Sequence, residues 1–192
     1  FKNRNRFVGI KSNGVATLKV GQYDSYFKTA AGNNQDIFND HNELDMTKVL
    51  VGEDRLTNVI GFETDKKLLG GLAFNIMFQQ GEESEGANSK AKGYEGSRDG
   101  FGDGVSASLT YENKDMGLAA AVAANRAIAS KFNAYDLSGI YTDAVRVTGS
   151  LDLGAMGASG LILGALGQTA QPTDNTVTVT KGTPDIATPE TR

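Results

Sequence analysis

Apolar and polar residues alternate in several segments of this chain, and this alternation constrains its fold more than any other feature. In residues 105–112, VSASLTYE, apolar or aromatic residues stand at every second position, with Ser, Thr and Glu between them. Segments 72–79 and 144–153 alternate in the same way. Successive side chains of a β-strand point to opposite faces, so a period of two indicates strands with two unlike faces. The chain is therefore predicted to be all-β.

The alternating segments and the connections between them predict an up-and-down arrangement. Eight strands are expected, at 3–11, 15–25, 55–64, 70–81, 103–113, 116–126, 143–153 and 159–169. Short turns are expected near 12–14, 65–67, 113–115 and 155–157, and long polar connections at 26–54, 82–102, 127–142 and 170–192. Short connections at one end and long ones at the other are typical of an antiparallel transmembrane β-barrel. The most apolar stretch, 151–167, is interrupted by Asp152 and several glycines and is too short for a membrane-spanning helix.

Charged residues in the middle of the expected strands indicate whether the apolar face of the sheet points inward to a dry core or outward. Glu63, Arg146 and Asp152 would all lie on the inner face, where a dry core would impose a cost of several kcal/mol on each unpaired charge. Tyr111 and Phe78 stand near strand ends, where an outer-membrane barrel has its aromatic girdles. We therefore expect the inverted pattern, with apolar side chains outward and polar side chains toward water.

The composition of the chain argues against several classes of function. The formal net charge is −4 and the pI about 5.1, which argues against a general nucleic-acid surface. The chain has no cysteine, so thiol nucleophiles, disulfides and thiolate zinc sites are excluded. Neither an initiator Met nor a signal peptide stands at the start, and we expect the 192 residues to be part of a longer chain.

Several segments resemble the trimeric general porins of Gram-negative outer membranes. NRNRFVGIK at 3–11 resembles the fourth strand of these porins, and ATLKVGQYDS at 16–25 resembles the fifth, which leads into their constriction loop. QDIFND at 35–40 resembles the acidic centre of that loop, and GDGVSASLTYENKDMGLAAAVAANR at 102–126 resembles a later hairpin. The likeness extends from Lys2 to about Thr169.

The resemblance implies a fold, a function and partners. Residues 1–192 would form about eight strands of a sixteen-stranded β-barrel, open or incomplete here, with 26–54 as the inward-folded constriction loop. Such a protein is no enzyme and needs no cofactor or metal: it lets small hydrophilic solutes and ions diffuse passively through a water-filled channel. Its expected partners are outer-membrane lipid, lipopolysaccharide and two further copies in a homotrimer, with no nucleic acid.

The resemblance also implies which residues line the pore constriction. Asp36 and Asp40 match the two acids of the loop, Lys2 and Arg4 match basic residues of the opposite wall, and Arg55 matches the basic residue that follows the loop. A further basic residue, Arg6, is added because it shares the strand face of Lys2 and Arg4 by parity. Where some members of the family have an arginine in the fifth strand, this chain has Gln22, and the sign of the ion preference stays open.

Other interpretations of the same residues stay open at this point. The acids of 35–45 could form a solvated surface loop or a cation site, and Lys2, Arg4 and Arg6 an exposed run of charge. Eight strands could close into a small structural or adhesin barrel without a channel, which predicts that 3–11 pairs with 159–169. A barrel enzyme would need a catalytic set, but His41 is the only histidine and no nucleophile motif accompanies it.

Overall fold

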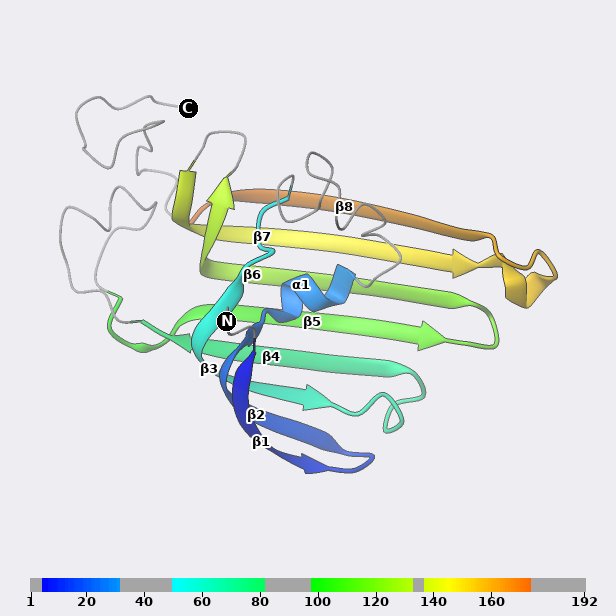
Figure 1. Cartoon of the computed structure of the whole chain (residues 1–192), viewed down its shortest axis with the longest axis horizontal. Coiled ribbons are helices and arrows are strands. Elements are labelled where there is room, and N and C mark those ends of the chain that lie inside the picture. The colour runs from blue at the N-terminus through cyan, green and yellow to red at the C-terminus, as the bar shows by residue number, and fades with distance from the viewer. Residues whose placement is uncertain (1–4, 32–49, 82–97, 133–136, 174–192) are drawn as a thin grey trace.

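The chain forms one antiparallel sheet of eight strands, as a computed structural model shows for residues 5–31, 50–81, 98–132 and 137–173. Each strand pairs with its neighbours in sequence, from β1 at one edge to β8 at the other (Figure 1). The strands are β1 (Arg6–Ser12), β2 (Ala16–Asp24), β3 (Arg55–Thr64), β4 (Leu72–Gln80), β5 (Phe101–Asn113), β6 (Leu118–Phe132), β7 (Leu137–Asp152) and β8 (Ile162–Pro172). The prediction of eight antiparallel strands is confirmed. The sheet is open, because the described residues of β1 and β8 do not pair with each other.

The connections that follow β1, β3, β5 and β7 are short and lie at one end of the sheet (Figure 1). The last of them contains a short 3-10 helix, η2 (Leu153–Met156), which ends at Gly157 with a φ of 95°. Glycine adopts this left-handed conformation easily, because it has no Cβ. The four predicted short turns are therefore confirmed.

One predicted loop is wrong. Residues 127–142 were expected to form a long polar connection, but β6 continues to Phe132 and β7 begins at Leu137. The reason is a bulge between Asn125 and Ile128, where Ala127 has a φ of 51° and its N–H donates to Asp143 Oδ1 at 2.9 Å. An extra residue in one strand shifts the alternation to the other parity, so a search for an unbroken period of two ends the strand too early.

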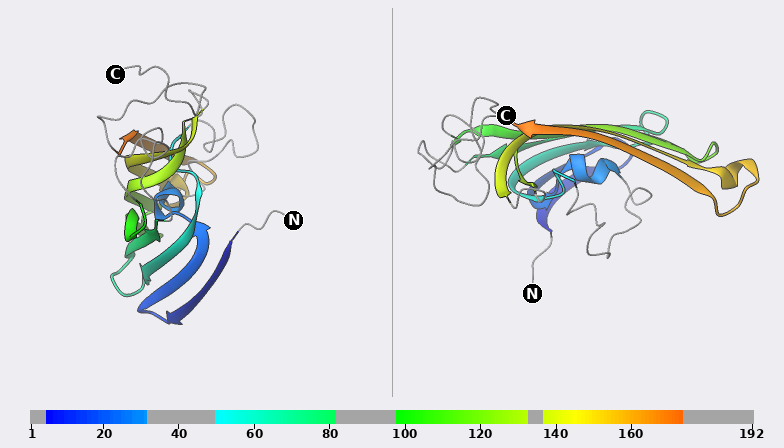
Figure 2. Two further views of the ribbon diagram at one scale, coloured as in Figure 1. Left: turned by 90° about the vertical axis from the view of Figure 1, so that its left-hand side faces the viewer. Right: turned by 90° about the horizontal axis from the view of Figure 1, so that it is seen from above.

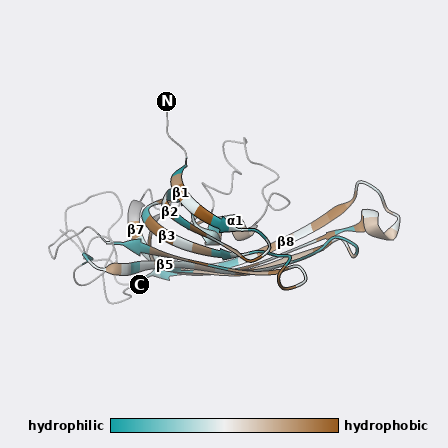
Figure 3. Cartoon of the chain, turned by 90° about the horizontal axis from the view of Figure 1, so that it is seen from below, coloured by the Kyte–Doolittle hydropathy of each residue, from teal (hydrophilic) through white to brown (hydrophobic). Residues whose placement is uncertain are grey.

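The two faces of the sheet differ in chemistry: apolar side chains are exposed on one face, and polar side chains are buried on the other. On one face Phe74, Leu109 and Val147 are 41%, 45% and 54% exposed, and on the other Ser108 and Arg146 are 3% and 0% exposed. Figure 3 shows the apolar and polar residues alternating along the strands. The exposed apolar side chains continue across the sheet, since Phe62 pairs with Ile76, Phe74 with Leu109, Leu109 with Val122 and Val122 with Val147.

A short helix, α1 (Tyr26–Ala31), covers the opposite face. The sheet curls around it, so that α1 lies on the concave side (Figure 2). Ser25 precedes the helix and acts as its N-cap, because its Oγ accepts from the N–H of Lys28 at 3.1 Å. Both clusters of buried apolar side chains in the described residues include members of α1, Tyr26 in one and Phe27 with Ala30 in the other. The core of the described structure is therefore the contact between α1 and the sheet.

The turn between β3 and β4 offers a matched pair of glycine substitutions. Gly70 and Gly71 have φ values of 61° and 99°, but a Cβ on Gly70 meets nothing within 4 Å, whereas a Cβ on Gly71 lies 2.2 Å from the carbonyl oxygen of Glu112. We predict that Gly70→Ala lowers the free energy of unfolding by about 1 kcal/mol, from backbone strain alone. Gly71→Ala is expected to cost about 1–3 kcal/mol more, because the Glu112 backbone must move. Denaturant unfolding of both variants measures the difference, and equal losses would contradict it.

Candidate functional site on the concave face

Small side chains make room for α1 on the sheet. Ala121 and Ala123 of β6 and Ala144 of β7 are buried against Phe27 and Ala30 of the helix. A helix backbone approaches a sheet closely only where the sheet side chains are short. The alanine-rich sequence of β6 therefore positions α1, which begins the 26–54 segment, against the concave wall.

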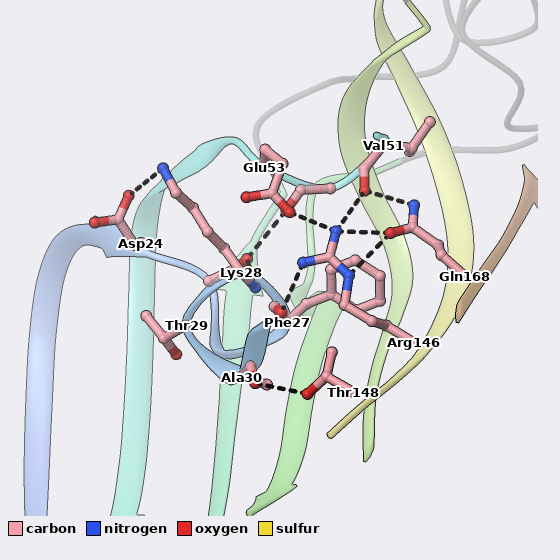
Figure 4. A network of polar contacts seen from close by, with 12 residues as sticks. Asp24, Phe27, Lys28, Thr29, Ala30, Val51, Glu53, Arg146, Thr148 and Gln168 are labelled. Atoms are coloured by element: carbon pink, nitrogen blue, oxygen red, sulfur yellow. Dashed lines mark hydrogen bonds and ion pairs between the residues drawn. The ribbon is translucent and has the colours of Figure 1, made fainter. Parts of the chain in front are cut away.

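Arg146 is the centre of the polar contacts beneath this segment (Figure 4). It lies in β7, is fully buried, and its guanidinium carbon is 4.3 Å from the centroid of the Phe27 ring. Its Nε and Nη2 donate to Gln168 Oε1 at 2.9 and 2.6 Å. Its Nη1 donates to the carbonyl oxygen of Phe27 and its Nη2 to that of Val51, each at 3.4 Å. Nη2 also forms an ion pair with Glu53.

These contacts explain how a full charge is tolerated in a position without solvent. A buried cation is stable only if it is paired and its N–H groups are used, because desolvation costs several kcal/mol. Glu53 supplies the opposite charge, and Gln168 supplies an oxygen that two N–H groups share. Gln168 is directly opposite Arg146 in the pairing of β7 with β8. The sheet register therefore brings these two side chains together.

Serine and threonine hydroxyls of the sheet hold the helix backbone directly. Ser106 Oγ of β5 accepts from the N–H of Phe27 at 3.1 Å, and Thr148 Oγ1 of β7 donates to the carbonyl oxygen of Ala30 at 3.2 Å. Both ends of a short helix carry backbone groups without intrahelical partners, and hydroxyls satisfy them here. The polar residues of the alternating strands thus serve as hydrogen-bond partners for the segment that covers them.

A second group of contacts, separate from those of Arg146, lies where α1 begins. Tyr23 and Tyr26 pack with ring centroids 6.2 Å apart, over Gly61, whose missing side chain leaves space for both hydroxyls. Lys19 forms an ion pair with Glu63, and its Nζ is 5.5 Å from the centroid of the Tyr23 ring. Burial of the phenol, and next the charge of Glu63, raise the pKa of Tyr26 well above its ordinary value.

Asp24, at the end of β2, forms ion pairs with Lys28 and Arg55. Its Oδ1 is 3.2 Å from Lys28 Nζ and 3.3 Å from Arg55 Nε, and all three side chains are partly exposed. The three residues come from β2, α1 and the start of β3, so the two ends of the 26–54 segment meet at this carboxylate. Partly exposed pairs of this kind contribute only about 0–1 kcal/mol each, so their main effect is to place charge at the concave side.

The structure places two of the six predicted constriction residues. Arg55 lies at the start of β3 beside Asp24, at the end of the loop as predicted. Arg6 pairs with Gln22 at the start of β1, and its register puts it on the face of Val8 and Ile10. The two arginines are not brought together. Asp36, Asp40, Lys2 and Arg4 lie outside the described residues, as does His41, so the constriction assignment stays a prediction.

Sequence reasoning missed the set formed by Glu53, Gln168 and Phe27. Arg146 was identified as a charge on the inner face, but its partners were not. The sequence held a partial signal for Gln168. Counting the same number of residues in both directions from the predicted turn at 155–157 places Gln168 close to the position opposite Arg146. No spacing rule connects either residue to Glu53, which reaches them only because the 26–54 segment folds onto the sheet.

Comparison of the sequence with protein families and with curated proteins finds no match. Among the described residues, no helix is long and apolar enough to cross a membrane. Within the same ranges, no three His, Cys, Asp or Glu residues are grouped as a metal ion would require. The site is therefore interpreted from its own geometry.

Two serines on the same face of β5 provide a test of the helix anchor. Ser106→Ala removes the acceptor of the buried Phe27 N–H, and we predict a loss of about 1–3 kcal/mol in the free energy of unfolding. Ser108→Ala is the control, because within the described ranges the hydrogen bond to Ser108 Oγ comes from the partly exposed side-chain amide of Asn75, and a loss of about 0.5–1.5 kcal/mol is expected. Chemical denaturation of both variants gives the comparison. A smaller loss for Ser106→Ala than for Ser108→Ala would show that the helix is held by other contacts.

The raised pKa of Tyr26 predicts a pH dependence of stability. The folded protein keeps the phenol proton at a pH where the unfolded chain releases it, so this stabilising contribution is complete below the unfolded pKa of about 10 and decreases above it. We predict that the wild-type denaturation midpoint falls more between about pH 9 and about pH 11.5 than that of Tyr26→Phe, which has no proton to lose. Identical pH profiles of the two proteins would rule out the contribution.

Proposed function

We propose that this chain is part of an outer-membrane β-barrel that forms a water-filled channel for passive diffusion of small hydrophilic solutes and ions. The observation that carries the proposal is the inverted distribution of side chains. Phe74, Leu109 and Val147 are exposed on the convex face, while Ser106 and Arg146 lie beneath α1 on the concave face. A water-soluble sheet protein buries the apolar face instead.

The convex face has the character of a lipid-facing surface. Its exposed apolar side chains extend from Val8 and Ile10 in β1 to Leu163 in β8. Soluble monomers seldom expose apolar patches larger than a few hundred Å². In a lipid bilayer the same surface is favourable, and a β-barrel leaves no backbone group of its strands unpaired there.

The open edges support a barrel larger than eight strands. Here β1 and β8 end the strand order, and each presents backbone N–H and C=O groups on its outer side. In hydrocarbon each such group costs several kcal/mol unless another strand pairs with it. The alternative, a closed eight-stranded structural or adhesin barrel, needs β1 to pair with β8, and no observation favours it.

The segment folded onto the concave wall supports a constricted channel. Residues 26–31 and 50–54 both contact the wall, and the acids of 35–45 belong to the chain between them. Fixed charges at a narrow point of a water channel act strongly on ions, because low-dielectric walls focus the field. We assign the constriction to Asp36 and Asp40 with Arg55, and with Lys2 and Arg4 as the basic wall that the resemblance implies. Arg6 is left out of this wall, because its register puts it on the convex face with Val8 and Ile10.

Planar-bilayer recording tests the proposal. The full-length protein that contains this chain is expected to insert and give stepwise conductance increases. Asp36→Asn with Asp40→Asn should shift the permeability ratio toward anions by about twofold or more, because two negative charges leave the narrowest part of the channel. Asp115→Asn, in the exposed turn between β5 and β6, removes a charge of the same kind and should leave the ratio unchanged. Absence of any conductance step in the wild-type protein would overturn the proposal.

A further inference from the structure

Arg146 joins the two ends of the 26–54 segment at one point of the wall. Its guanidinium contacts the carbonyl oxygen of Phe27, near the start of the segment, and the carbonyl oxygen of Val51 and the carboxylate of Glu53, near its end. Figure 4 shows these groups around the guanidinium of Arg146. We call residues 26–31 the entry stem and residues 50–54 the exit stem.

The entry stem has anchors that do not depend on Arg146. Ser106 holds the N–H of Phe27, and Thr148 holds the carbonyl oxygen of Ala30. Phe27 and Ala30 also pack against buried alanines of the sheet, Ala123 among them. These contacts are local hydrogen bonds and apolar burial, and they persist if the guanidinium is removed.

The exit stem is attached differently. Among the described residues, its hydrogen bonds and ion pair to β7 and β8 are made with Arg146 and Gln168: Gln168 Nε2 donates to the carbonyl oxygen of Val51 at 2.8 Å, and Arg146 contacts the same oxygen and Glu53. Gly52, with a φ of 91°, packs on the Phe27 ring so closely that a Cβ would lie 2.7 Å from it. The exit stem thus rests on the entry stem, receives a hydrogen bond from Ser25 Oγ at the Gly52 carbonyl oxygen (3.4 Å), and is held to β7 and β8 by Arg146 and Gln168.

We propose that Arg146, with Gln168, is a positioning residue that holds the exit stem to the wall and thereby fixes the width of the constriction. Its loss releases residues 50–54 while α1 stays in place. The effect on the channel rests on the proposed function. The attachment of the exit stem does not, and it can be measured separately.

Hydrogen exchange of the folded full-length protein measures the attachment. In Arg146→Met we expect amides of 50–54 to exchange about tenfold faster or more, because the exit stem loses its contacts with Arg146. Amides of 27–31 should change by less than about threefold, because the entry stem loses its contact with Arg146 but keeps those with Ser106 and Thr148. Arg146→Lys keeps the charge but lacks the planar fork of donors, so it should restore part of the protection. Arg126→Met is the matched control, since it removes an exposed arginine from the neighbouring strand β6.

Single-channel recording of the same variants measures the consequence. Arg146→Met is expected to increase open-channel current noise and conductance, and Arg126→Met to change neither, because a released stem moves within the constriction. Equal exchange rates of 50–54 in the two Met variants would overturn the anchoring, as would equal acceleration of both stems. If local exchange changes but noise and conductance do not, the role in fixing the width of the constriction is overturned.

A folding failure of Arg146→Met is covered by a second variant. Gln168→Met removes the donor to Val51 and the shared acceptor of Arg146, and it should give the same pattern of exchange with a smaller amplitude. Failure of both variants to fold, with Arg126→Met folded, would overturn the proposal, since the pair would then support the whole sheet. Absence of conductance in the wild-type protein would overturn the channel and leave the exchange result to decide the anchoring.

Discussion

The buried guanidinium of Arg146 is the constraint on which the concave face depends. A charge in a position without solvent is compatible with folding only when an opposite charge and hydrogen-bond acceptors surround it. Glu53, Gln168 and the carbonyl oxygens of Phe27 and Val51 supply them. Because Phe27, Val51 and Glu53 come from the 26–54 segment, the sheet and this segment require each other: without the segment, Arg146 would lose its counter-ion.

The same arrangement explains why the sheet has so little core of its own. Large apolar side chains such as Leu109 and Val147 stay exposed on the convex face. In the described residues, both buried apolar clusters form where α1 meets the sheet: one includes alanines of β6 and β7, and the other includes Val59, Met77 and Ile128. Hydrophobic burial within the described residues therefore stabilises the attachment of α1 more than the sheet. The convex surface needs an apolar environment of another kind, which a bilayer provides in the proposed channel.

Much of the fold could be predicted from sequence because strand alternation is a local property. The eight strands, their order and the four short connections follow from the period of two and from the glycines in those connections. The extension of β6 and β7 could not be predicted in this way. At Ala127 one extra residue reverses the alternation, and the bulge is stabilised by Asp143, sixteen positions away. A periodicity search has no access to a contact of that range.

The sequence by itself determined which residues share a strand face, since the parity of side chains is fixed by backbone geometry. It therefore placed Arg146 opposite in orientation to Val147, and Ser108 opposite to Leu109. Only the tertiary structure decided what each face meets. The inner polar residues became partners for a helix and for Glu53 because the chain between β2 and β3 folds back over the sheet. That return is set by hydrogen bonding and charge pairing between residues far apart in the chain, which no local pattern contains.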